Sequence, residues 1–181
     1  MKLSTQDICQ IALFVGVMAV FAQVSIPQPL GVPFSLQAWA VALAGLVLGP
    51  KKGAIAAFIY ILLGTVGVPV FTMFSNGAGV VARNTVGFVV SFPFMAFVAG
   101  FGRSEKIWAA YLWLFIAIII NFTFGLLYFS WALNISMLAA AAATVTPFIL
   151  PTAVKLAILP WIALSIRRAL KRAGVVYSRS T

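Results

Sequence analysis

The sequence contains no histidine, only two carboxylates and only one cysteine in 181 residues. The lack of histidine excludes imidazole-based zinc or haem sites and histidine acid–base catalysis. The carboxylates, Asp7 and Glu105, lie far apart in the chain, so neither a hard-cation site nor a hydrolytic carboxylate pair is expected. Cys9 has no second cysteine with which to form an internal disulfide. The sequence therefore predicts no metal site, no cofactor and no enzyme activity.

Charged residues of either sign are also scarce. They make up 8% of the chain, whereas 64% is hydrophobic and the mean hydropathy is +1.14. A soluble domain has about a quarter charged residues, and a chain of this size could not bury so much apolar surface. The long apolar segments lack the period-2 alternation of a membrane barrel. We therefore expect an all-α integral membrane protein, and no nucleic-acid binding despite the net charge of +10.

Six apolar segments predict a bundle of six transmembrane helices, in one domain over residues 1–181. The segments cover approximately residues 8–25, 35–48, 54–66, 80–101, 107–133 and 146–166. The second and third segments are short, because about 13 residues rise only about 20 Å in a helix. The uncharged stretches 26–34 and 67–79 adjoin them, and irregular backbone is tolerated in a membrane where it lines a cavity. We expect both stretches to turn inward and cover a site; the alternative is ordinary surface loops.

The distribution of basic residues predicts the orientation. With six spans and both termini in the cytoplasm, the loops 26–34, 67–79 and 134–145 are external and contain no basic residue. Ten of the twelve basic residues are then cytoplasmic, as the positive-inside rule requires, and the carboxy-terminal cluster is also suited to anionic lipid or a cytoplasmic partner. These ten are Lys2, Lys51, Lys52, Arg103, Lys106, Arg167, Arg168, Lys171, Arg172 and Arg179.

The two remaining basic residues, Arg83 and Lys155, fall in the external half of the expected bundle. Lys155 lies near the middle of the last span, where a lysine without a partner costs about 2.5–3.5 kcal/mol. Neither carboxylate is expected on that side, so the two cations predict an anionic ligand. The alternatives are a Lys155 that is neutral or bonded to helix carbonyls, and an Arg83 that extends to the membrane interface.

Uncharged polar residues collect in the same half of the bundle. Amides and hydroxyls donate and accept hydrogen bonds, which suits a neutral polar group such as a urea. Together with aromatic side chains they predict a mostly apolar pocket; the alternative is hydrogen bonding between helices. The polar candidates are Gln37, Asn76, Asn84, Thr85, Asn121 and Thr152, and the aromatic candidates are Trp39, Tyr60, Phe71, Phe74 and Trp113.

Five stretches resemble the biotin-specific substrate-binding subunits of energy-coupling-factor (ECF) transporters, the BioY family. They are IPQPLGVPFSLQ at 26–37, GPKKG at 49–53, the whole of 64–79, TVGF at 85–88 in place of the family's T-G-G-Y, and 151–155 in place of P-G-D-x-x-K. The chain departs from the family at Arg83 and Asn84, where a Gly-Pro is usual, at Val86, and at Thr152, where an acid is expected. If that acid bonds the ring nitrogens of biotin, Asn121 or Asn84 is expected to replace it.

The resemblance implies a six-helix ECF S component in a prokaryotic cell membrane that captures biotin from outside. It implies as partners a transmembrane coupling protein (the T component) and two cytoplasmic ATPases, with Ala12 and Gly16 of the first helix facing the coupling protein. The stretch 26–34 would act as a lid, with Pro27, Pro29, Pro33 and Phe34 as its characteristic residues. A stand-alone facilitator or channel for a small organic anion is the alternative.

Overall fold

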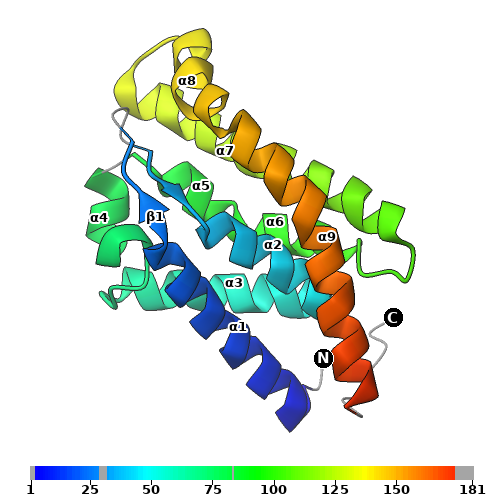
Figure 1. Cartoon of the computed structure of the whole chain (residues 1–181). Coiled ribbons are helices and arrows are strands. Elements are labelled where there is room, and N and C mark those ends of the chain that lie inside the picture. Colours follow the sequence, from blue (N-terminus) through cyan, green and yellow to red (C-terminus); the bar gives the residue numbers. More distant parts are fainter. Residues whose placement is uncertain (1–2, 29–31, 83, 174–181) are drawn as a thin grey trace.

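The computed structural model describes residues 3–28, 32–82 and 84–173, and in these ranges the chain is predominantly helical (Figure 1). A two-stranded antiparallel ribbon, β1 (Ser25–Ile26) and β2 (Phe34–Ser35), flanks the stretch that was expected to be a lid. The α-helices are α1 (Thr5–Gln23), α2 (Gln37–Leu48), α3 (Pro50–Thr65), α4 (Gly77–Ala82), α5 (Val86–Val90), α6 (Phe92–Gly100), α7 (Ile107–Leu133), α8 (Met137–Thr144) and α9 (Ile149–Arg172); η1 (Thr72–Phe74) and η2 (Thr146–Phe148) are short 3-10 turns.

The third segment starts earlier than expected, at Pro50 and not near residue 54. Proline suits the first turn of a helix, where its missing N–H has no partner to lose. Gly49 precedes it with a φ of 89°, a conformation that favours glycine. Lys51 and Lys52 therefore belong to the first turn of α3, and not to a loop.

The expected continuous span 80–101 is wrong, because the chain forms three helices there. Asn84 has a left-handed φ of 55° and separates α4 from α5. Ser91 separates α5 from α6, and Pro93 lies at the start of α6. Proline cannot donate to the carbonyl four residues earlier, and its ring disfavours a continuous helix.

The stretch 134–145, expected to be an external loop, is largely helical, since it contains α8 (yellow in Figure 1). Asn134 ends α7 in the left-handed conformation, a common helix stop. Ser136 then caps α8 by accepting a hydrogen bond from the Ala139 N–H at 3.3 Å, and an alanine run follows. This cap and the high helix propensity of alanine are the features of the sequence that indicate a helix here.

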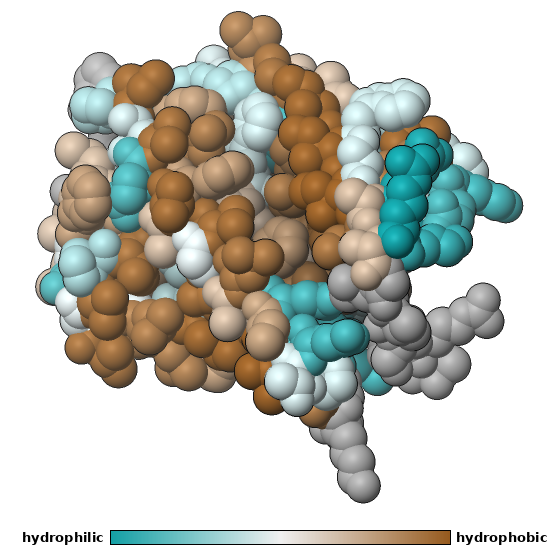
Figure 2. Space-filling view, turned by 60° about the horizontal axis from the view of Figure 1, so that its bottom comes forward, coloured by the Kyte–Doolittle hydropathy of each residue, from teal (hydrophilic) through white to brown (hydrophobic). Residues whose placement is uncertain are grey.

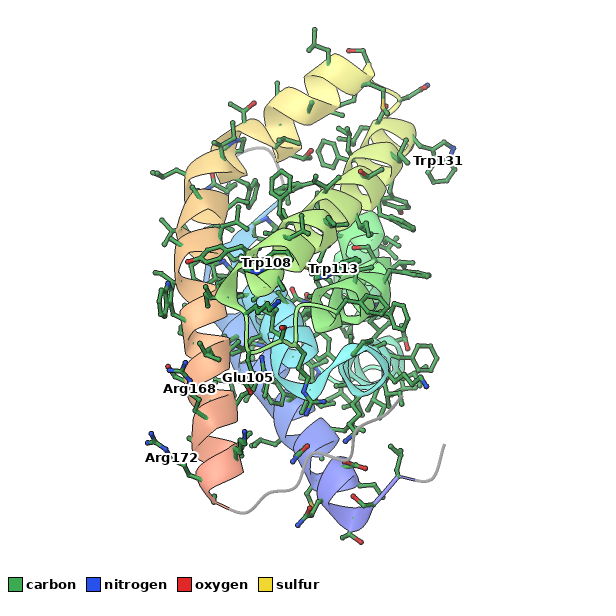
Figure 3. All side chains as sticks on the ribbon, turned by 90° about the vertical axis from the view of Figure 1, so that its right-hand side faces the viewer. Glu105, Trp108, Trp113, Trp131, Arg168 and Arg172 are labelled. Carbon is green, nitrogen blue, oxygen red and sulfur yellow. The ribbon has the colours of Figure 1, made fainter. Side chains whose placement is uncertain are left out.

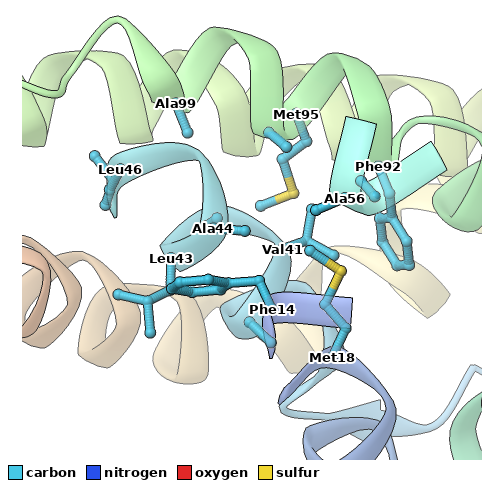
Figure 4. Packing of buried hydrophobic residues seen from close by; sticks show 14 of the residues in the cluster. Phe14, Met18, Val41, Leu43, Ala44, Leu46, Ala56, Phe92, Met95 and Ala99 are labelled. Carbon is cyan, nitrogen blue, oxygen red and sulfur yellow. The ribbon is translucent and has the colours of Figure 1, made fainter. Parts of the chain in front are cut away.

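Helix α2 lies at the centre of the bundle and packs against α1, α3, α6 and α9. Residues 40–49 are all buried, as expected for a helix that is apolar on every side. Figure 4 shows Val41, Ala44 and Leu46 of α2 between Met95 of α6 and Phe14 of α1. The short second segment is thus buried inside the protein.

The outer surface is largely apolar. Among the described residues, three helical stretches are long and apolar enough to cross a membrane: Thr5–Gln23, Ile107–Leu133 and Met137–Arg172. Only about a third or less of each stretch is buried in the protein, and apolar side chains cover much of the face seen in Figure 2. Large exposed apolar surfaces of this kind are typical of proteins that contact lipid.

Most of the charged residues in the described part of the chain lie at one end of the bundle, with Lys155 as an exception. Figure 3 shows Arg168 and Arg172 on the end of α9 near Glu105, while Trp131 lies at the opposite end. The first turn of α1 and the last turn of α9 share this charged end (Figure 1). Lys52 forms a buried ion pair with Asp7 there, which joins α1 to α3.

Candidate functional site: a cavity lined by a buried lysine

A cavity lies between α2, α5, α6, α7 and α9, under the stretch 32–35 and beside the stretch 71–75. Its volume is about 90 Å³, counted as the space open to the centre of a water molecule. A single water needs about 10–15 Å³ by this measure, so the cavity has room for a small organic molecule. Most of its wall is apolar, as is usual for ligand sites.

Lys155 lies in this wall on α9, and its side chain is 6% exposed. Among the described residues, none forms a hydrogen bond or an ion pair with it. Thr152 lies one turn earlier on the same helix and also lines the cavity. A buried ammonium without a protein partner favours an anionic ligand, because the charge is otherwise poorly solvated.

Asn121 on α7 provides a second polar point of the wall. Its Nδ2 donates to the Phe88 carbonyl oxygen at 3.1 Å and to Ser91 Oγ at 2.6 Å. Ser91 Oγ in turn donates to the Phe88 carbonyl at 2.8 Å. This network ties α7 to the junction of α5 and α6.

Gln37 also lines the cavity, but both ends of its amide have protein partners. Its Nε2 donates to Tyr60 Oη, and its Oε1 accepts from Thr72 Oγ1, both at 2.8 Å. Tyr60 donates to the Val70 carbonyl at 2.8 Å. Gln37 therefore positions the stretch 70–72 against α2 and α3, and retains one amide hydrogen for a ligand.

Gln23, at the end of α1, holds the same stretch from the other side. Its Nε2 donates to the Phe71 carbonyl at 3.2 Å, and its Oε1 accepts from the Phe74 N–H at 2.8 Å. Phe71 is 1% exposed, and its ring lies directly over Gly64. The stretch 67–79, predicted to turn inward, does so in part: Phe71, Thr72 and Ser75 line the cavity, whereas residues 67–69, 73, 74 and 78 are exposed.

Four phenylalanine rings form a row along the wall. Phe34 of β2 lies 6.2 Å from Phe148, Phe148 lies 6.5 Å from Phe122, and Phe122 lies 6.4 Å from Phe88, measured between ring centroids. The row connects the end of the expected lid, through η2, to α7 and α5. Apart from Phe34, these residues were not predicted, because a phenylalanine inside an apolar span gives no sign of which side it faces.

The structure brings together seven of the predicted residues in the cavity wall: Gln37, Thr85, Asn121, Thr152, Lys155, Pro33 and Phe34. Three others do not line it. Asn76 instead caps α4 by accepting from the Gly79 N–H at 3.4 Å, Asn84 forms the turn before α5, and Pro27 is exposed after β1. Arg83 and Pro29 lie outside the described residues.

The predicted aromatic set is correct only in part. Trp39 and Phe71 line the cavity, and Tyr60 lies behind the wall in the Gln37 network. Phe74 is 71% exposed, and Trp113 packs against Phe101 at 5.1 Å on a different part of α7. The wall is completed by Phe88, Phe92, Phe122 and Phe148.

Fold and site together define a class of protein: an apolar helical bundle of membrane-protein type that encloses a cavity for a small molecule. The sequence model of the BioY family matches residues 1–172. The chain therefore belongs to the BioY family.

Individual relatives agree with this assignment. The chain is 36% identical over 156 residues to a probable biotin transporter BioY of Pyrococcus horikoshii, a match that covers 86% of this chain and 92% of the relative. It is 28% identical over 171 residues to biotin transporter BioY2 of Lactococcus lactis subsp. cremoris, with 93% of each chain covered. The fold is similar to the crystal structure of the S component for biotin from an ECF-type ABC transporter, with a TM-score of 0.82, 22% identity, and coverage of 92% of this chain and 95% of the other.

Proposed function

We propose that this protein captures biotin from the external side of the membrane and acts as the S component of an ECF-type ABC transporter. Membership of the BioY family supports the substrate, and the relatives described above are named biotin transporters. The observation that carries the proposal is the buried Lys155, which lacks a partner among the described residues and faces a largely apolar, aromatic cavity. Biotin combines a carboxylate, an apolar tail and ring, and a polar ureido group.

In this proposal Lys155 binds the carboxylate of biotin. A charge-assisted hydrogen bond is stronger than a neutral one, and its strength rises where water is excluded. Thr152, Thr85 and Asn121 are proposed to serve the polar groups of the ligand, while the phenylalanine row and Trp39 cover the apolar part. Gln37 is proposed to contribute its remaining amide hydrogen.

The stretch 26–34 is proposed to be the lid. Its support is that Val32 is buried, Pro33 and Phe34 line the cavity, and Phe34 packs against Phe148. The two ends of the stretch are joined by the antiparallel pairing of β1 with β2, which holds them beside the cavity.

We propose a multi-pass arrangement of six spans in a prokaryotic plasma membrane, with both termini in the cytoplasm. The gathering of basic residues at the end shared by α1 and α9 supports this orientation, since the cytoplasmic side carries the excess of Lys and Arg. The cavity then lies in the external half, beside the lid.

Energy is proposed to come from a separate module, a T component with two cytoplasmic ATPases. Ala12 and Gly16 are candidates for the contact with the T component, because both are exposed on α1. A Cβ added at Gly16 would meet no atom of the described residues within 4 Å, so this face offers room to a partner. Small residues permit close helix contacts in membranes.

The proposal can be tested by titrating the purified chain with biotin and following tryptophan fluorescence, to which Trp39 in the cavity wall should contribute. Saturable quenching is expected, and no response would contradict biotin capture. Uptake into vesicles with and without the ATPase module then distinguishes an S component from a facilitator. Uptake that needs the module supports the proposal, whereas equal uptake without it supports the facilitator.

A further inference from the structure

We propose that Ser91 is a positioning residue that fixes Asn121 as a hydrogen-bond acceptor for a ureido N–H of the ligand. The inference rests on the proposed function and extends it to a residue that does not itself line the cavity. It starts from the interrupted helix between α5 and α6, and follows the hydrogen bonds from there to the cavity wall.

The interruption frees the Phe88 carbonyl. In a continuous helix this oxygen would accept from the backbone N–H four residues later, but α5 ends at Val90 and α6 starts at Phe92. In the described part of the chain its hydrogen-bond donors are two side chains, Ser91 and Asn121. The break in the helix thereby creates an acceptor inside the bundle.

The Nδ2 of Asn121 is held at this junction by two acceptors. It donates to the Phe88 carbonyl at 3.1 Å and to Ser91 Oγ at 2.6 Å. Ser91 is fully buried, and it uses its own hydrogen on the same carbonyl at 2.8 Å. Both donor atoms of this network, Asn121 Nδ2 and Ser91 Oγ, therefore have an acceptor.

The network also determines which way the amide of Asn121 faces. A flipped amide would place Oδ1 against the Phe88 carbonyl, so that two acceptors would face each other without a hydrogen. The observed orientation leaves Oδ1 without a hydrogen bond from any described residue, on a side chain that lines the cavity. Asn121 thus offers the ligand its Oδ1 as an acceptor, and complements Lys155, which offers donors only.

This arrangement can replace the acid that the family resemblance led us to expect at Thr152. A carboxylate would accept a hydrogen bond from a ring N–H of biotin, and an amide oxygen held in a fixed direction can do the same. Ser91 matters because without it the amide loses one of its two anchors. The expected consequence is weaker discrimination in favour of ligands that present an N–H.

The test compares biotin with two analogues, each methylated on one ureido nitrogen, by titration of the purified full chain. We expect the wild type to bind one analogue much more weakly than biotin. Ser91→Ala should weaken biotin binding by about fivefold to tenfold, the effect of one hydrogen bond, and reduce the preference for biotin over that analogue. Ser91→Thr, which keeps the hydroxyl, should retain the preference, and Asn121→Leu should abolish it.

Thr123→Ala provides the matched control, since Thr123 carries an exposed hydroxyl on α7, the helix of Asn121. Removal of this hydroxyl should change neither the affinity for biotin nor the affinity for the analogue. The inference is overturned if Ser91→Ala weakens biotin and the analogue by equal factors, or if Asn121→Leu keeps the preference. Asn121→Leu provides this test even if Ser91→Ala fails to fold. If the wild type binds biotin and both methylated analogues equally well, only this inference is overturned. If the wild type binds no biotin, the proposed function is overturned as well.

Discussion

The buried ion pair between Lys52 and Asp7 should be a main determinant of stability at the charged end of the bundle. Their side chains are only 6% and 9% exposed, and Asp7 also belongs to the capping box of α1, where it accepts from the Ser4 N–H at 3.1 Å. Replacing Lys52 by methionine leaves the carboxylate of Asp7 buried without its cation. The loss of one partner from a buried pair typically costs about 3–5 kcal/mol.

The pair lies in the first turns of α1 and α3, at the end of the bundle, so solvent at the membrane interface should reduce this cost. We therefore expect Lys52→Met to destabilise the protein by about 2–4 kcal/mol. For a chain of this size that corresponds to a fall of roughly 5–15 °C in the melting temperature. The double variant Asp7→Asn, Lys52→Met should be less destabilised than the sum of the two single variants, because it leaves no unpaired charge.

The assay is thermal unfolding of the detergent-purified chain, with Glu105→Gln as the control. Glu105 forms the other described ion pair, with Arg167 at 3.8 Å, but its side chain is 72% exposed. An exposed pair contributes only about 0–1 kcal/mol, so this control should change the melting temperature by a few degrees at most. If Lys52→Met has no larger effect than Glu105→Gln, or if the two single effects simply add, the reasoning from burial is wrong.

Three further predictions concern packing, the partner surface and the cavity. Gly125→Ala should lower both the melting temperature and the biotin affinity, because a Cβ there would overlap the Phe88 ring and overpacking costs about 1–3 kcal/mol. Unchanged values for both would contradict this contact. Gly16→Leu should leave biotin binding to the isolated chain unchanged and abolish uptake with the ATPase module, and normal uptake would rule out this face as the docking surface. Lys155→Met should raise the melting temperature of the biotin-free protein, because it removes a buried charge without a partner among the described residues; a lower melting temperature would indicate that Lys155 has a structural partner.

Composition alone was sufficient to predict a helical membrane protein, because so apolar a chain has few other options. The span 107–133 was predicted with the bounds that α7 has in the structure, since it is long, apolar and uninterrupted. The interruptions of the span 80–101 were not predicted. They depend on the left-handed conformation of Asn84 and on Pro93, and a hydropathy pattern reveals neither of them. The helix α8 was missed although its Ser136 cap is visible in the sequence.

A residue of the candidate site could be predicted where its side chain is energetically unfavourable in an apolar span. Lys155 stood out because a lysine near the middle of an apolar span needs an explanation, and the structure places it in the cavity wall. Asn76 and Asn84 are polar too, but turns and caps account for them equally well, and local backbone geometry decides between the two roles. Ser91 could not be identified, because its importance depends on contacts between the α5–α6 junction and α7 that no local sequence pattern encodes.

The central claim is that Lys155 binds the carboxylate of biotin, and a thermodynamic cycle tests it most directly. The affinities of the wild type and of Lys155→Met are measured for biotin and for biotinol, in which an alcohol replaces the carboxylate, with Lys106→Met at an exposed position as control. The account predicts that Lys155→Met weakens biotin at least tenfold more than biotinol, as expected for a charge-assisted bond worth about 1.5–3 kcal/mol, while Lys106→Met weakens neither. Equal losses for biotin and biotinol, or no loss for biotin, would contradict it.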